Sequence, residues 1–209
     1  NAGSAHGDER GWVRVRAVTI VVGAVDDRGA VWMGADSQAS SGWDRTIRRD
    51  QKVFRVGSYL MGFTSSYRMG QVLRYKLAPP EPPHEGDLFG FMVVDFVDHV
   101  RAAFKAAGFC KTENGVESGG HFLVGVCGRL FHIEGDYQVG EPECGYSAVG
   151  CGAAYALGAM AVSQGTTEER IRAALGAAIQ FSNGCGGPCS VMSIGGVIGS
   201  AENARIREA

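Results

Sequence analysis

The first third of the chain carries the short apolar runs and alternation that are typical of β-strands. Residues 18–25, VTIVVGAV, form a β-branched run, and a second apolar run at 30–35 follows a four-residue polar turn. Two such runs around a turn predict a β-hairpin. Residues 52–56 and 59–63, which flank Gly57-Ser58, predict a second hairpin. Two consecutive hairpins indicate an antiparallel sheet.

After residue 64 the apolar positions change to intervals of three and four, which is the period of a helix. This spacing predicts a helix over 65–77 and, beyond a proline-rich loop at 78–86, a second helix over 88–107. Residues 109–120 are polar and rich in glycine, and we interpret them as a loop. The remaining predicted elements are strands at 121–127, 129–134, near 137–139 and 189–197, and helices at 153–164 and 167–181.

The predicted order of elements is ββββ–αα–βββ–αα–β. Strands in antiparallel groups, each followed by a pair of helices, fit two packed sheets with helices on both outer faces, which is an α+β fold. We find no linker and no internal repeat, so residues 18–199 are expected to form a single domain. Residues 1–17 are interpreted as a flexible or non-native extension, although the alternation at 12–16 could continue the first strand backwards. Residues 200–209 are interpreted as a polar tail.

The composition of the chain excludes several classes of protein. Of 209 residues, 45% are hydrophobic and 20% charged, with a net charge of −2, so the chain has neither the composition of a disordered protein nor the basic character of a nucleic-acid binder. No apolar run is long enough to span a membrane, and no signal peptide is recognisable. The six cysteines include no CxxC pair. We therefore expect free thiols, a cytoplasmic location, and neither a metal nor another cofactor.

Several short segments then stand in a specific order. They are TIVVG from Thr19, GADSQAS from Gly34, QKVF from Gln51, MGFTSS from Met61 and AVGCGAAYA from Ala148. In order and spacing these segments resemble proteasome β-subunits and HslV-type peptidases, over roughly residues 19–197. The resemblance implies the four-layer αββα sandwich of N-terminal-nucleophile (Ntn) hydrolases.

The chemistry of such a site can be stated from the residues. A threonine hydroxyl is a weak nucleophile until a base takes its proton, and the α-amine of an N-terminal Thr19 could be that base. The Lys52 ammonium would lower the pKa of this amine, and Asp36 would hold the ammonium in place. A backbone N–H near Ser65 would form the oxyanion hole. Cys151 takes the position of the serine in the GSG turn of the family.

Each of these residues also has an ordinary structural interpretation. Thr19 could be a plain strand residue, Asp36 a turn former and Lys52 a solvated charge at a strand edge. Ser37 and Cys151 are other candidate nucleophiles and are less favoured. A Ser-His-Asp triad is not predicted, because no carboxylate partner near His121 or His132 was recognised in the sequence, and His99 lies on an apolar helix. Arg45, Arg48, Arg49 and Lys52 form a basic cluster with interspersed aspartates, and we interpret it as a solvated loop.

The residue before Thr19 is Val18, and a peptide bond between them would remove the amine base. One hypothesis is that Val18 corresponds to the translational start, so that loss of the initiator exposes Thr19. The leading functional hypothesis is a threonine-type amidohydrolase that cleaves peptides through an acyl-enzyme on Thr19. The alternative is a catalytically silent structural or interaction protein in a homo-oligomer. The resemblance also implies assembly into a ring and an ATPase partner.

Overall fold

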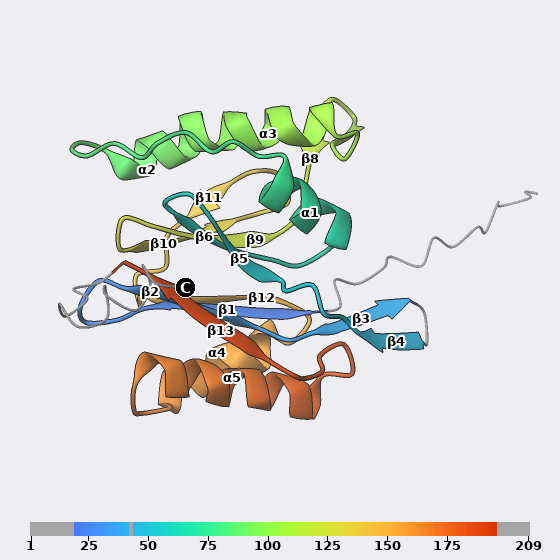
Figure 1. The fold of residues 1–209 in the computed structure, drawn as a ribbon, viewed down its shortest axis with the longest axis vertical. Coiled ribbons are helices and arrows are strands. Elements are labelled where there is room, and N and C mark those ends of the chain that lie inside the picture. The colour runs from blue at the N-terminus through green and yellow to red at the C-terminus, as the bar shows by residue number, and fades with distance from the viewer. Residues whose placement is uncertain (1–18, 42–43, 196–209) are drawn as a thin grey trace, which may run out of the picture.

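The computed structural model describes residues 19–41 and 44–195. Two antiparallel sheets stack face to face, with one helical layer outside each, as Figure 1 shows. The α+β, four-layer αββα prediction is thereby confirmed. The predictions for residues 1–17 and 200–209, with the possible strand at 12–16, lie outside the described residues.

The first sheet has the order β12-β1-β2-β13 and is entirely antiparallel. The first residue of β1 lies opposite the last residue of β12, Ile20 against Gly150, while Val21 lies opposite Ala35 of β2. This register brings the start of β1 and the ends of β2 and β12 to one end of the sandwich. The strands are β1 (Ile20–Val25), β2 (Val31–Ala35), β12 (Tyr146–Gly150) and β13 (Ser190–Ile194).

The second sheet has the order β11-β10-β9-β6-β5. Val53, the first residue of β5, lies opposite Gly62 near the end of β6, and Phe63 of β6 lies opposite Phe122, the first residue of β9. The start of β5 and the end of β6 therefore meet. The strands are β5 (Val53–Val56), β6 (Tyr59–Phe63), β9 (Phe122–Val126), β10 (Arg129–Ile133) and β11 (Val139–Gly140).

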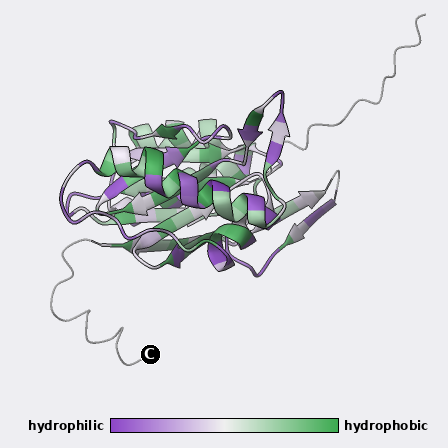
Figure 2. Cartoon of the chain, turned by 90° about the horizontal axis from the view of Figure 1, so that it is seen from above, coloured by the Kyte–Doolittle hydropathy of each residue, from purple (hydrophilic) through white to green (hydrophobic). Residues whose placement is uncertain are grey.

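The outer helices cover the two sheets; α1, α3 and α5 are amphipathic, whereas α4 is apolar on all sides. The capping box of Thr166 and Glu169 begins α5, where two backbone donors at the helix start are satisfied. Figure 2 looks onto the layer of α2 and α3, where hydrophilic and hydrophobic residues alternate along the helix. The helices are α1 (Tyr67–Tyr75), α2 (Leu88–Phe91), a π-helical turn (Met92–Phe96), α3 (Val97–Ala106), α4 (Ala153–Val162) and α5 (Thr167–Phe181).

Three apolar clusters fill the spaces between the four layers. One lies between the second sheet and α1 and α3, one between the first sheet and α4 and α5, and one between the sheets. Phe104, Leu175 and Leu123 are fully buried examples of the three. Because each strand alternates its side chains between two faces, the central strands of both sheets are apolar on both. None of the helices in the described ranges is both long and apolar enough to cross a membrane.

One loop prediction was wrong, and one hairpin was missed. Residues 109–120, expected to be a loop, contain a small hairpin of β7 (Lys111–Glu113) and β8 (Val116–Ser118). A further hairpin of β3 (Gln38–Ser41) and β4 (Asp44–Ile47) was not predicted and extends from the body of the molecule (Figure 1). Both hairpins carry mostly polar side chains, so hydrophobic periodicity, which follows burial, could not reveal them.

Candidate active site

The five residues singled out from the sequence come from segments that meet at one end of the sandwich. Thr19 precedes β1 and is 4% exposed, whereas Asp36 follows β2 and Lys52 precedes β5. Ser65 lies in the turn between β6 and α1, and Cys151 follows β12. The antiparallel registers account for this convergence, because the start of one strand lies beside the end of its neighbour.

Asp36 and Lys52 form a buried ion pair. The Lys52 Nζ lies 2.6 Å from Asp36 Oδ1, and their side chains are 1% and 0% exposed. The ammonium also donates to the carbonyl of Gln38 at 2.6 Å. Burial lowers the pKa of Lys52 below its usual value, and the neighbouring Asp36 carboxylate opposes this shift. Lys52 is buried, so its interpretation as a solvated strand-edge charge was wrong. Asp36 Oδ2 does accept from the amide two residues on, as a turn former would, but its burial and its ion pair go beyond that role. The solvated-loop interpretation was also wrong for Lys52 and for Arg45, which lies on β4.

The Asp36 carboxylate accepts four hydrogen bonds. Its Oδ1 accepts from the amide of Ile20 at 3.1 Å in addition to Lys52, and its Oδ2 accepts from the amides of Gln38 at 3.2 Å and Gly186 at 3.0 Å. A buried carboxylate with this many donors is well compensated for the loss of water. Through the Ile20 amide, the ion pair is joined to the residue next to Thr19.

A pair of thiols lies on another side of Thr19. The Cys151 Sγ is 3.4 Å from the Thr19 backbone nitrogen, accepts from the Ser182 hydroxyl at 3.3 Å and lies 3.7 Å from the Cys185 Sγ. These three donors stabilise a thiolate, with Cys185 the largest contributor, and lower the pKa of Cys151 to about 5. The same contact and burial raise the pKa of Cys185.

The backbone around Gly150, in the AVGCG segment, explains why this position is a glycine. Its φ is +112°, and a Cβ atom added there would stand 2.1 Å from the Thr19 carbonyl oxygen. No side chain fits unless the backbone of Thr19 moves, because the obstacle is main chain. Gly150 therefore sets how closely β12 approaches the candidate nucleophile.

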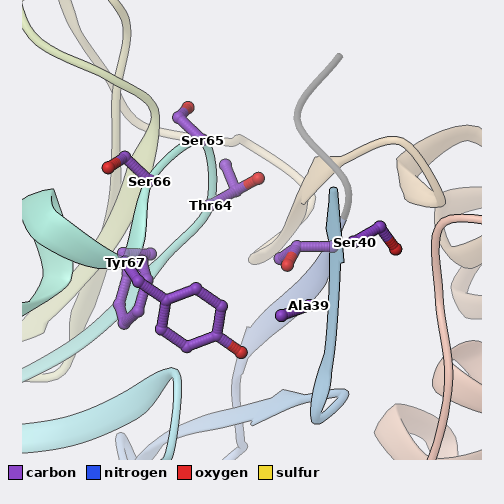
Figure 3. Close-up of a pocket in the computed structure, with 8 residues that line it drawn as sticks. Ala39, Ser40, Thr64, Ser65, Ser66 and Tyr67 are labelled. Atoms are coloured by element: carbon purple, nitrogen blue, oxygen red, sulfur yellow. The ribbon is translucent and has the colours of Figure 1, made fainter. Parts of the chain in front are cut away.

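A small pocket of about 60 Å³ opens beside Thr19. In Figure 3, Ala39 and Ser40 stand on one side, and Thr64, Ser65, Ser66 and Tyr67 on the other. Ser65 has a φ of +69°, an uncommon value for a residue other than glycine. Within the part of the chain that the structure describes, Thr64 Oγ1 and Tyr67 OH are buried without a hydrogen-bond partner.

Four residues around the site were not among the predicted site residues. Gln38 and Gly186 contact the Asp36 carboxylate, and Ser182 and Cys185 contact Cys151. Ser182 and Cys185 lie 31 and 34 residues from Cys151 along the chain, and no local pattern in the sequence indicates that they meet it. The statement that His121 and His132 have no nearby carboxylate was also wrong, since Glu134 lies within 3.3 Å of both.

Comparison with solved structures shows which fold this is. BPH of Thiobacillus denitrificans, in complex with epoxomicin, is 21% identical, with a TM-score of 0.68 over 84% of this chain and 98% of that one. HslV from Trypanosoma brucei is 18% identical, with a TM-score of 0.59 over 84% and 98%. Anbu (ancestral beta-subunit) from Yersinia bercovieri is 14% identical, with a TM-score of 0.58 over 84% and 81%.

The chain therefore has the fold of proteasome-type Ntn-hydrolase subunits, and the resemblance expected from its motifs is confirmed at the level of the fold. No family model matches the chain. No curated protein sequence matches it either.

Proposed function

We propose that the protein is a threonine-type amidohydrolase that cleaves peptides once Thr19 is the first residue of the chain. The observation that carries the proposal is the buried Asp36–Lys52 pair, joined by the Ile20 amide to the position of Thr19. A buried ion pair contributes little net stability compared with apolar residues of the same volume. Its position beside a hydroxyl that borders a pocket supports a chemical role.

In the proposed reaction, the Thr19 Oγ1 attacks the carbonyl carbon of the substrate amide and its proton passes to the Thr19 α-amine. An α-amine has a pKa of about 7.7–8.0, and the Lys52 ammonium lowers it further, so the neutral base is available near neutral pH. The tetrahedral oxyanion accepts a hydrogen bond from a backbone N–H at Ser65. The C–N bond then breaks, and the leaving amine takes the proton from the α-amine.

The product of this half-reaction is an ester between the substrate acyl group and Thr19 Oγ1. Water then attacks the ester carbonyl, the α-amine accepts a proton from the water, and the proton returns to Oγ1 as the carboxylic acid leaves. In this scheme the sulfur of Cys151 contacts the Thr19 nitrogen, which is the base, and orients it toward Oγ1. No metal or other cofactor takes part in these steps.

Substitution of the nucleophile tests the proposal. In protein whose chain begins at Thr19, Thr19→Ala should abolish hydrolysis of a fluorogenic peptide, while Thr19→Ser should retain a measurable part of it because the hydroxyl remains. Thr46→Ala, on the exposed β4, is the matched control and should leave the rate unchanged. Epoxomicin, which is bound by the similar BPH, should compete with the peptide. Equal rates for the wild type and Thr19→Ala would refute the proposal.

The second candidate is a silent structural subunit of a homo-oligomer, and a different observation supports its oligomeric part. Apolar side chains are exposed on the outer surface of α4 and α5, among them Tyr155, Val162 and Phe181, which are 45%, 79% and 62% exposed. An exposed apolar patch of this kind indicates a protein contact. We propose that this surface joins copies of the chain, in a ring as the resemblance implies. Phe181→Glu should lower the mass found by light scattering, and an unchanged mass would contradict this contact.

A further inference from the structure

A cluster of two histidines and a glutamate lies on the second sheet, outside the proposed catalytic residues. His121 directly precedes β9, His132 is on β10, and Glu134 directly follows β10. Ile133 lies opposite Phe122, so the next pair in register is Glu134 and His121. Cross-strand partners share a face of the sheet, and so do residues two apart on one strand. The register therefore places all three side chains on one face.

The ligand atoms of these side chains are close together. One donor atom from each of the three residues lies within 4.8 Å of the other two. His121 Nδ1 is 2.7 Å from Glu134 Oε2, and His132 Nε2 is 3.3 Å from Glu134 Oε1. Four-coordinate zinc holds its nitrogen and oxygen ligands at about 2.0–2.2 Å, which separates neighbouring ligand atoms by roughly 3.3–3.5 Å. Small side-chain rotations would thus bring the three atoms around one ion.

The state of His132 is the second observation. Its Nε2 atom is buried and makes no hydrogen bond among the described residues, because its approach to Glu134 lacks hydrogen-bond geometry. Buried polar atoms are seldom left without a partner. The His132 Nε2 atom faces a carboxylate and a second imidazole but has no hydrogen-bond partner among the described residues. A nitrogen in this position is suited to binding a metal ion.

We propose that His121, His132 and Glu134 bind a divalent transition-metal ion, with Zn²⁺ the best match to two imidazoles and a carboxylate. The side chains are 45%, 24% and 39% exposed, so the site is open to solvent and water completes the coordination. This site is separate from the Asp36–Lys52 pair and does not depend on the hydrolase proposal.

The position of His121 suggests what the ion does. The His121 carbonyl accepts from the Thr64 amide at 3.1 Å, and its amide donates to Ser65 Oγ at 3.3 Å. Thr64 and Ser65 line the pocket beside Thr19. The backbone of His121 is hydrogen-bonded to the turn at Thr64 and Ser65. A metal bound to the His121 ring would therefore restrain the position of this turn. The role is structural: the ion fastens the ends of β9 and β10 beside the pocket.

The test is a titration of the full chain, reduced and freed of metal by a chelator, with Co²⁺ as a spectroscopic substitute for Zn²⁺. We expect one Co²⁺ per chain without the thiolate charge-transfer absorption that cysteine ligands would give, and displacement of Co²⁺ by Zn²⁺. His132→Ala and Glu134→Gln should each weaken binding at least about tenfold, since loss of a ligand costs no less than loss of a supporting residue. His99→Ala, an exposed histidine on α3, should bind as the wild type does.

Thermal unfolding gives a second measurement, and it also shows whether the variants fold. Zn²⁺ at about one hundred times its Kd should raise the Tm of the wild type by on the order of 5 °C or more. The Tm of Glu134→Gln, which keeps the size of the side chain, should rise clearly less. The proposal is overturned by absence of binding, by thiolate absorption that accompanies binding, or by equal affinity and equal Tm shift in the wild type and Glu134→Gln.

Discussion

Two sides of Thr19 are built from different chemistry. On one side, Asp36 and Lys52 are fully buried and their polar contacts measure 2.6–3.2 Å. On another, Cys151 and Cys185 make contacts of 3.3–3.7 Å with one another and with their neighbours. The first side is rigid because a buried charge without its partner is costly. The second is held by weak thiol hydrogen bonds, and its charge changes near pH 5, where the lowered pKa of Cys151 lies.

The comparison suggests a division of roles. Under the proposed mechanism, Lys52 would supply the fixed positive charge that an α-amine base needs, while Cys151 and Cys185 would adjust the surroundings of the same nitrogen atom. Substitution of Asp36 or Lys52 should therefore lower both the free energy of unfolding and the rate of hydrolysis. Substitution of Cys151 or its neighbours should mainly shift the pH dependence of the site.

The largest effect is expected from Lys52→Met. This change leaves Asp36 charged and buried without its ammonium, so the free energy of unfolding should fall by about 3–5 kcal/mol. Peptide hydrolysis should fall by about 1,000-fold or more in the protein that remains folded. Urea unfolding and the fluorogenic assay measure the two. Lys105→Met, which breaks an exposed ion pair with Glu117, is the matched control and should leave the free energy of unfolding nearly unchanged.

Gly150→Ala should have the next largest effect. The added Cβ requires the Thr19 backbone to move, and alanine is strained at the φ of +112°. We expect a loss of about 1–3 kcal/mol in unfolding free energy and a clear loss of hydrolysis. Gly57→Ala has a positive φ of +54° but nothing within 4 Å of the new Cβ. If both variants lost hydrolysis equally, the close approach of Gly150 to Thr19 would not be the cause.

The alkaline limit of activity tests the charge of Lys52. Because burial lowers its pKa, the ammonium loses its proton at a lower pH than an exposed lysine, whose pKa is about 10.4. The kcat/KM for the peptide should therefore decline below that pH as the positive charge beside the α-amine disappears. A profile that stays flat up to pH 10.4 would argue against a role for the ammonium.

Alkylation tests the sulfur side. With its pKa lowered to about 5, Cys151 is a thiolate above that pH and a thiol below it. Its labelling by iodoacetamide, followed by peptide mass spectrometry, should reach half its maximal rate near pH 5. Ser182→Ala removes a hydrogen bond to the thiolate and should raise this midpoint by about one to two units. If the midpoint is unchanged in Ser182→Ala, the Ser182 hydroxyl does not lower the pKa of Cys151.

The smallest effect is expected from Cys151→Ser, which restores the serine of the related GSG turn. The contact with the Thr19 nitrogen can be kept by an oxygen, so hydrolysis should change by less than about tenfold. A loss comparable to that of Lys52→Met would mean that the two sides of Thr19 do not differ as described.

The sequence allowed the layered fold to be predicted because its strands and helices are defined by burial, as in the apolar runs at 20–25 and 122–126. The polar hairpins of β3–β4 and β7–β8 bury few side chains and left no such pattern. Asp36 and Lys52 were predicted as site residues because the segments that contain them resemble those of proteasome β-subunits in order and spacing. Their contacts with Gln38 and Gly186, and the meeting of Cys151 with Cys185, depend on tertiary packing that no local pattern encodes.

The most direct measurement compares two forms of the protein, one that begins at Thr19 and one that retains Val18, after exposure to a covalent threonine-directed inhibitor. The account predicts that intact mass and peptide mapping will find one inhibitor molecule on Thr19 in the first form and none in the second. Equal modification of both forms, or modification at Cys151 alone, would contradict the claim that one residue provides both the attacking oxygen and the base.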